Sequence, residues 1–161
     1  MRNVVVIAAL LALVVSAGGQ TGDKAKRYGI ESDTKNYPQG TPKEALGSVL
    51  KALGEKEVRY LMAYLADPEF VDKRVAMYAQ QVSPKLSEAE KKALGFEKLV
   101  EKTAENFQED PTKIKELQRF LKDGEWEEGA GEAVARLKNV LARKVFMKKV
   151  EDRWVLQDRE K

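Results

Sequence analysis

The chain of 161 residues contains no cysteine and no histidine. Without cysteine there is no disulfide, so the fold must be held together by its apolar core alone. Catalysis by a Cys-His or Ser-His pair and zinc or copper sites built on these side chains are excluded. No Asp-x-Asp-x-Asp-Gly calcium loop and no glycine-rich phosphate loop followed by lysine occurs either. The sequence therefore predicts no metal site and no cofactor.

A large excess of charge of one sign is also lacking, because 29 basic and 26 acidic residues give a net charge of +3. The basic doublets at 91–92, 143–144 and 148–149 lie among acidic residues, a pattern typical of a solvated surface. We therefore expect no nucleic-acid partner.

One long apolar run is present, the twelve residues 4–15, which follow Arg2 and precede Ser16 and Ala17. This order is typical of a secretory signal peptide, and we expect residues 1–17 to be removed by cleavage after Ala17. Twelve residues form about 18 Å of helix, less than the ~30 Å of a hydrocarbon core, so no stable membrane span is expected. An uncleaved anchor is the alternative. A lipid anchor needs a cysteine after the run and is excluded. The sequence predicts an exported, bacterial protein that is periplasmic or secreted.

Residues 18–40 are rich in glycine and polar side chains, with Tyr28, Ile30 and Tyr37 as the large apolar groups. This composition predicts a flexible polar linker. The alternative is that the two tyrosines dock on the domain or on a partner. Residues 41–161 are long enough to form a single domain.

Helix start signals recur after this segment. Residues 41–44, Thr-Pro-Lys-Glu, are typical of a capping box with proline at the first helical position. Asp67-Pro68 predicts a second helix start, with Asp67 as the cap. The Ser-Glu-Ala-Glu of residues 87–90 predicts a third, with a capping box. We expect three glycines to end helices, namely Gly54, Gly95 and Gly124. The chain from residue 42 to residue 123 is therefore predicted to be helical.

The composition changes after Gly124, where glycines disfavour helix. Residues 132–150 fit both a helical stripe and strands. We favour strands, because residues 132–138 alternate and residues 145–147 and 154–156 flank a polar turn. The predicted fold class is α+β, with N-terminal helices packed on a C-terminal curved antiparallel sheet of three to four strands and a helical middle segment.

Two segments carry a resemblance to a known family. Residues 41–70, TPKEALGSVLKALGEKEVRYLMAYLADPEF, resemble the opening of small exported domains in the nuclear transport factor 2-like superfamily. Residues 144–158, KVFMKKVEDRWVLQD, resemble their closing hairpin. The resemblance implies a cone open at one end, in which a curved sheet wraps the N-terminal helices, and a homodimer formed through the sheet face.

The same resemblance implies where a site would lie. Enzymes of the superfamily place a carboxylate near a tyrosine at the open end of the cone, where burial raises the pKa of the carboxylate. The residues to inspect for such chemistry are Asp67, Glu69, Tyr64 and Glu127. Those that could line an apolar pocket are Tyr60, Met62, Phe70, Trp126 and Trp154. Helix capping by Asp67 and core packing of the aromatic residues are the alternatives.

Two hypotheses of function follow. The first is a non-enzymatic exported domain that binds a small apolar ligand or another envelope protein. The second is a histidine-independent, carboxylate-based lyase or isomerase of the ketosteroid-isomerase type. The enzyme needs a buried carboxylate beside a tyrosine in a pocket, whereas the binding domain needs only a cavity or an apolar patch. A companion role in a larger envelope assembly would require a large flat apolar face instead.

Overall fold

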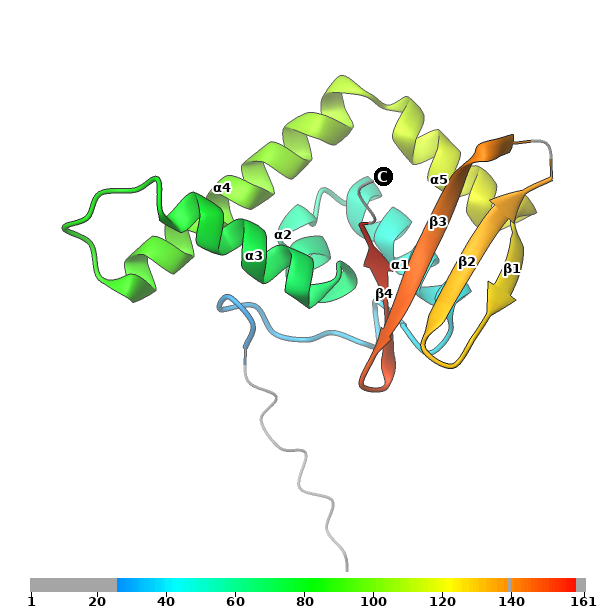
Figure 1. The fold of residues 1–161 in the computed structure, drawn as a ribbon, viewed down its shortest axis with the longest axis horizontal. Helices are drawn as coiled ribbons and strands as arrows, with labels where there is room; N and C mark the ends of the chain where they lie inside the picture. Colours follow the sequence, from blue (N-terminus) through cyan, green and yellow to red (C-terminus); the bar gives the residue numbers. More distant parts are fainter. Residues whose placement is uncertain (1–25, 139, 159–161) are drawn as a thin grey trace, which may run out of the picture.

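The computed structural model of the chain describes residues 26–138 and 140–158. Within these residues, helices precede a four-stranded antiparallel sheet with the order β1-β2-β3-β4 (Figure 1). The sheet does not close into a barrel. The α+β prediction is therefore confirmed. The predicted signal peptide, residues 1–17, lies outside the described residues. No described helix has the length and apolar character needed to cross a membrane.

Helix α1 (Pro42–Gly54) begins and ends where the sequence predicts. The Thr41 hydroxyl accepts a hydrogen bond from the Glu44 amide, and the Glu44 carboxylate accepts one from the Thr41 amide, both at 3.1 Å. This reciprocal pair satisfies two amides that a helix start leaves without intrahelical partners.

The cap gives a first prediction. Thr41→Ala is expected to lower the free energy of unfolding by about 1 kcal/mol, because the Glu44 amide loses its acceptor. The loss is measured as a shift in the urea midpoint at constant m value. Thr34→Ala, at an exposed position, should change stability by less than about 0.5 kcal/mol. Equal effects of the two substitutions would contradict a stabilising role for the cap.

The segment after α1 is helical, but it is not one regular helix. It consists of α2 (Val58–Tyr60) and a π-helix, η1 (Leu61–Leu65), whose last turn is closed by the Ala66 amide donating to the Leu61 carbonyl at 2.9 Å. Every residue of η1 is buried. Residue 66 then forms a parallel bridge with Leu156. The π-helix thus joins the helical half of the molecule to the edge of the sheet.

Helices α3 (Pro68–Ala79) and α4 (Glu88–Glu109) pack on each other and extend away from the sheet (Figure 1). Asp67 and Ser87 cap them as predicted. The prediction that Gly95 ends a helix is wrong, because α4 continues through it. A Cβ atom at this position would lie 2.5 Å from the Val75 carbonyl oxygen. Glycine is therefore needed here for the close approach of α3 and α4.

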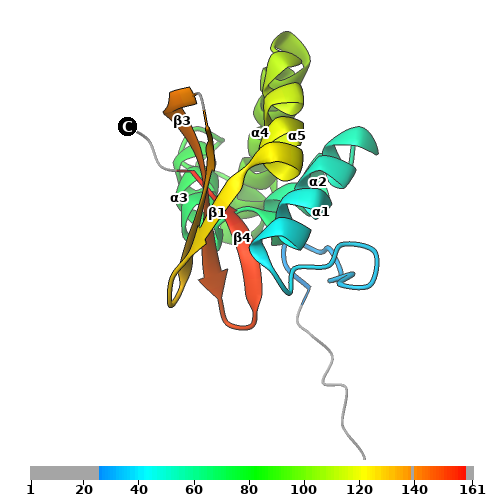
Figure 2. The ribbon, with the colours of Figure 1, turned by 90° about the vertical axis from the view of Figure 1, so that its right-hand side faces the viewer.

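Helix α5 (Thr112–Asp123) leads into the strands β1 (Glu125–Glu128), β2 (Glu132–Leu137), β3 (Val140–Val150) and β4 (Arg153–Gln157). The strand predicted at 132–138 corresponds to β2, which ends one residue earlier, and those predicted at 145–147 and 154–156 lie in β3 and β4. Strand β1 is additional. Helices α1 and α5 cover one face of the sheet (Figure 2). The core between them, which we call the sheet-side core, contains Ala45, Leu46, Phe120, Ala133, Ala135, Leu137, Val145, Met147 and Trp154.

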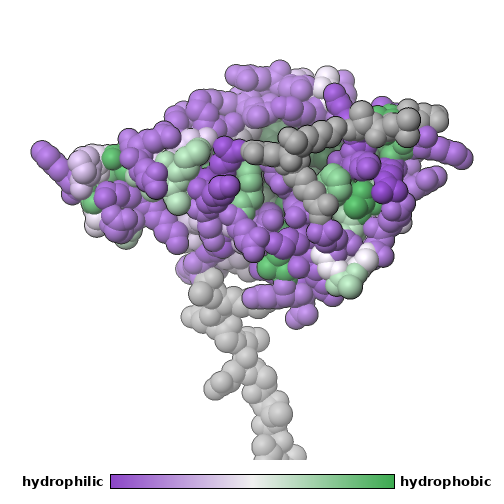
Figure 3. All heavy atoms as spheres, viewed as in Figure 1, coloured by the Kyte–Doolittle hydropathy of each residue, from purple (hydrophilic) through white to green (hydrophobic). Residues whose placement is uncertain are grey.

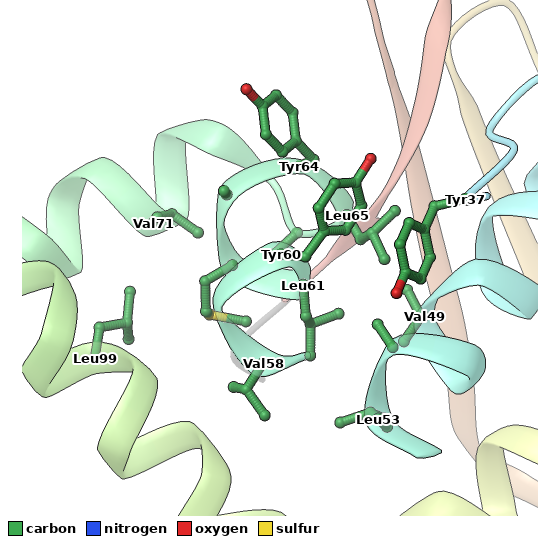
Figure 4. Packing of buried hydrophobic residues seen from close by; sticks show 14 of the residues in the cluster. Tyr37, Val49, Leu53, Val58, Tyr60, Leu61, Tyr64, Leu65, Val71 and Leu99 are labelled. Atoms are coloured by element: carbon green, nitrogen blue, oxygen red, sulfur yellow. The ribbon is translucent and has the colours of Figure 1, made fainter. Parts of the chain in front are cut away.

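A second core, the helix-side core, lies among α1, α2, η1, α3 and α4. Figure 4 shows part of it, with side chains from α1, η1, α3 and α4 directed toward one another. The ring of Tyr37 belongs to this core and stacks on the Tyr60 ring, with centroids 4.3 Å apart. Tyr37 is only 8% exposed.

Residues 26–40, predicted as part of a flexible linker, therefore pack on the folded body. Besides Tyr37, the Tyr28 ring stacks on Phe96 with centroids 4.2 Å apart. The buried Gln39 amide nitrogen donates to the Tyr64 carbonyl at 2.9 Å and to the Trp154 carbonyl at 2.8 Å. These contacts correct the prediction for residues 26–40. The composition is that of a linker, but two tyrosines and one buried glutamine fix the segment in place.

Candidate ligand-binding cleft

The predicted acid–base residues do not converge on one site. Asp67 is 6% exposed and caps α3 by accepting a hydrogen bond from the Glu69 amide at 3.1 Å. Lys148 Nζ lies 3.8 Å from its carboxylate and 2.8 Å from that of Glu69. Glu127 lies on exposed β1 and forms an ion pair with Arg136. Each of these carboxylates thus has a structural partner.

Tyr64 is also used structurally. Its hydroxyl donates to the Ile30 carbonyl at 2.7 Å and accepts from the Arg27 amide at 3.1 Å. It therefore ties residues 26–30 to η1. Neither of these two hydrogen bonds involves a carboxylate.

Two tyrosine–carboxylate pairs that the sequence reasoning missed do exist. Tyr28 donates to Asp72 at 2.5 Å, and Tyr37 donates to Glu55 at 2.7 Å. Burial and the neighbouring carboxylate raise the pKa of Tyr28, and the same causes raise the pKa of Tyr37 to about 12. A general acid or base works best with a pKa near the operating pH. Both pairs are thus suited to fastening the segment rather than to proton transfer.

Of the five residues predicted to line a pocket, two do so. Met62 of η1 and Phe70 of α3 line the candidate cleft. Tyr60 is buried in the helix-side core, and Trp154 is buried in the sheet-side core, against which Trp126 packs. Core packing, the alternative reading, holds for these three aromatic residues.

The candidate cleft has a volume of about 560 Å³ and opens between η1, the helices α3, α4 and α5, and the strands β3 and β4. Green, hydrophobic atoms are visible between purple side chains on this face in Figure 3. The apolar lining comes from elements far apart in the sequence and includes Leu61, Met62, Phe70, Leu99, Phe107, Leu117 and Leu156.

Helix α4 contributes side chains both to the helix-side core and to the cleft. Its residue Phe96 is buried in the helix-side core, and Leu99 belongs both to that core and to the wall of the cleft. One and two turns later, Thr103 and Phe107 are only partly buried and line the cleft. The stripe of apolar residues on α4 was visible in the sequence. Its division into a core part and a cleft part depends on where the facing elements end.

The rim of the cleft is polar and mainly basic. It carries Arg74, Lys102, Lys113 and Lys144, together with the acidic residues Glu116 and Asp158. A hydrogen bond from Lys102 to Glu105 raises the pKa of this lysine. An apolar interior below a charged rim is the common arrangement of small-molecule sites.

No group of three or more acidic side chains that could hold a metal ion occurs among residues 26–138 and 140–158. Comparison of the chain with protein-family models, with curated proteins and with solved structures found no match. The functional argument therefore rests on the chemistry of the cleft itself.

Proposed function

We propose that the protein binds a small apolar ligand in the candidate cleft and does not transform it. The observation that carries this proposal is the apolar wall built from η1, three helices and two strands around about 560 Å³. This volume lies within the range of about 300–1,000 Å³ for ligand pockets. A ligand that buries about 300 Å² of apolar surface there would gain on the order of 7 kcal/mol before the cost of association.

A carboxylate-based lyase or isomerase, the second hypothesis from the sequence, has weaker support. It needs a buried carboxylate beside a tyrosine within the pocket. Asp67 caps α3, and the Tyr64 hydroxyl binds the Ile30 carbonyl of the docked segment. Of the two acidic residues at the rim, Glu116 pairs with Arg143 at 2.5 Å. We therefore favour binding without catalysis.

The setting of this activity is also a proposal. The apolar run of residues 4–15 and the small residues after it support export through a cleavable signal peptide, to a periplasmic or secreted location in a bacterium. The order of helices followed by an antiparallel sheet supports kinship with the nuclear transport factor 2-like superfamily. Such kinship would imply a homodimer through the sheet face. The alternative to a small ligand is another envelope protein, bound at the cleft or at the sheet face.

Filling the cleft tests the proposal. Thr103 lies on α4, lines the cleft and donates a hydrogen bond to Met62 Sδ at 3.7 Å. Thr103→Trp should place an indole in the cleft and weaken binding of the uncharged dye Nile red at least tenfold in a fluorescence titration. Gln108→Trp, at an exposed position on the same helix, should leave dye binding unchanged. The proposal would be refuted if both variants bound the dye as tightly as the unsubstituted protein does, with equal midpoints of thermal unfolding.

A further inference from the structure

A second hollow, of about 380 Å³, lies apart from the cleft and differs from it in chemistry. It is formed by residues 26–28, by Lys92 of α4 and by Arg153 at the start of β4, together with Tyr64 and Asp72. In Figures 1 and 2 the segment in blue passes close to the turn between β3 and β4. Four cations from three separate parts of the chain thus meet here. We call this site the basic hollow.

Two of the four cations have acidic partners. Lys26 pairs with Glu31 at 2.7 Å, and Arg27 pairs with Asp72 at 2.6 Å. Lys92 and Arg153 have no acidic partner within the part of the chain that the structure describes. The hollow therefore keeps a net charge of +2.

The carboxylate of Asp72 is paired with Arg27, and its Oδ1 atom also accepts a hydrogen bond from Tyr28. Lys92 Nζ lies instead 5.4 Å from the centroid of the Tyr28 ring, and Arg153 Cζ lies 5.7 Å from that of the Tyr64 ring. Cation–π contacts of this kind are worth only about 0.5–1 kcal/mol at exposed sites. They hold the cations over the rings without offsetting their charge.

The two rings are themselves fixed in place. Tyr28 stacks on Phe96 with ring planes 6° from parallel, and its hydroxyl is bound to Asp72. The Tyr64 hydroxyl donates to the Ile30 carbonyl and accepts from the Arg27 amide. The contacts of residues 26–30 therefore hold the rings and the cations above them in place before a ligand binds. This reduces the conformational entropy that the side chains lose on binding.

We propose that the basic hollow binds an anionic group of the phosphate type, with Lys92 and Arg153 as its direct contacts. Two cations of like charge at one concave surface repel each other, and an anion between them turns this repulsion into attraction. The guanidinium fork of arginine suits the paired oxygens of a phosphate, and lysine adds a compact charge. Inorganic phosphate and the phosphodiester of a lipid headgroup share this chemistry. The proposal does not depend on the cleft.

The test uses the double variant Lys92→Gln/Arg153→Gln of the full chain and two probes. Inorganic phosphate is titrated calorimetrically at low ionic strength, and vesicles of phosphatidylglycerol or phosphatidylcholine are tested by co-sedimentation. We expect binding to phosphate, or to phosphatidylglycerol but not phosphatidylcholine vesicles, and at least tenfold weaker binding by the double variant. The probe that binds identifies the source of the anionic group.

The matched control is the double variant Lys122→Gln/Lys149→Gln, which removes two exposed cations, one from α5 and one from β3, outside the hollow. It should reduce binding less than twofold. Two results would overturn the proposal: no binding of either probe, or equal losses in the double variant and the control. The second result would mean that binding follows overall charge and not the basic hollow.

Discussion

Tyr37→Ala is expected to lower the free energy of unfolding by about 3 kcal/mol. The side chain is 8% exposed, stacks on Tyr60 and donates a hydrogen bond to Glu55. Truncation to alanine leaves a cavity in the helix-side core and removes an aromatic pair worth about 0.5–1.5 kcal/mol beyond its burial. The loss is measured by urea denaturation followed by circular dichroism.

The size of this effect distinguishes the docked segment from a flexible linker. In a linker, the same substitution would leave stability unchanged within about 0.5 kcal/mol, and that result would contradict the docking of residues 26–40. Tyr37→Phe is the matched control, because it keeps the ring and removes only the hydroxyl bound to Glu55. We expect it to cost about 1 kcal/mol.

Gly95→Ala is expected to destabilise the protein by about 2 kcal/mol, although alanine favours helix over glycine by about 1 kcal/mol. The added Cβ atom would lie 2.5 Å from the Val75 carbonyl oxygen and 3.0 Å from the Ala79 amide nitrogen. Because both are backbone atoms, α3 and α4 must move apart, and overpacking of this kind costs about 1–3 kcal/mol. Steric conflict should therefore outweigh helix propensity. Thermal and urea unfolding both measure the outcome.

Gly47→Ala on α1 is the control with the opposite expected sign. Beyond its chain neighbours and the backbone of its own helix, a Cβ atom there would have no atom within 4 Å, so only the gain in helix propensity remains. We expect the free energy of unfolding to rise by about 1 kcal/mol. If both alanine substitutions stabilised the protein, the close packing of α3 on α4 would be contradicted.

Local signals in the sequence predicted much of the fold. The caps at Thr41, Asp67 and Ser87 start helices as expected, because a side chain that satisfies nearby amides acts within a few residues. The strands after Gly124 were also predicted, since alternation and a polar turn are local patterns.

Features that depend on distant partners were not predictable in this way. Residues 26–40 have the composition of a linker, and only the partners of Tyr28, Tyr37 and Gln39 show that they are docked. Gly95 resembles a helix end in sequence, but its role is set by the backbone of α3.

The candidate site was predicted only in part for the same reason. Met62 is buried in the helix-side core and also lines the cleft together with Phe70, whereas Tyr60 and Trp154 are buried in the two cores without lining it. All four are large apolar residues with the same sequence signature. Which of them faces a cavity depends on where α4 and the sheet end relative to one another.

The most direct test of the proposed ligand-binding cleft is an NMR titration of the methionine methyl groups with an uncharged aliphatic alcohol such as 1-decanol. Met62 lines the cleft, Met147 is buried in the sheet-side core, and Met77 is 38% exposed on α3. The account predicts a saturable shift of the Met62 signal with Met147 and Met77 unchanged. A shift confined to Met77, or no shift at any of the three, would contradict ligand binding in the cleft.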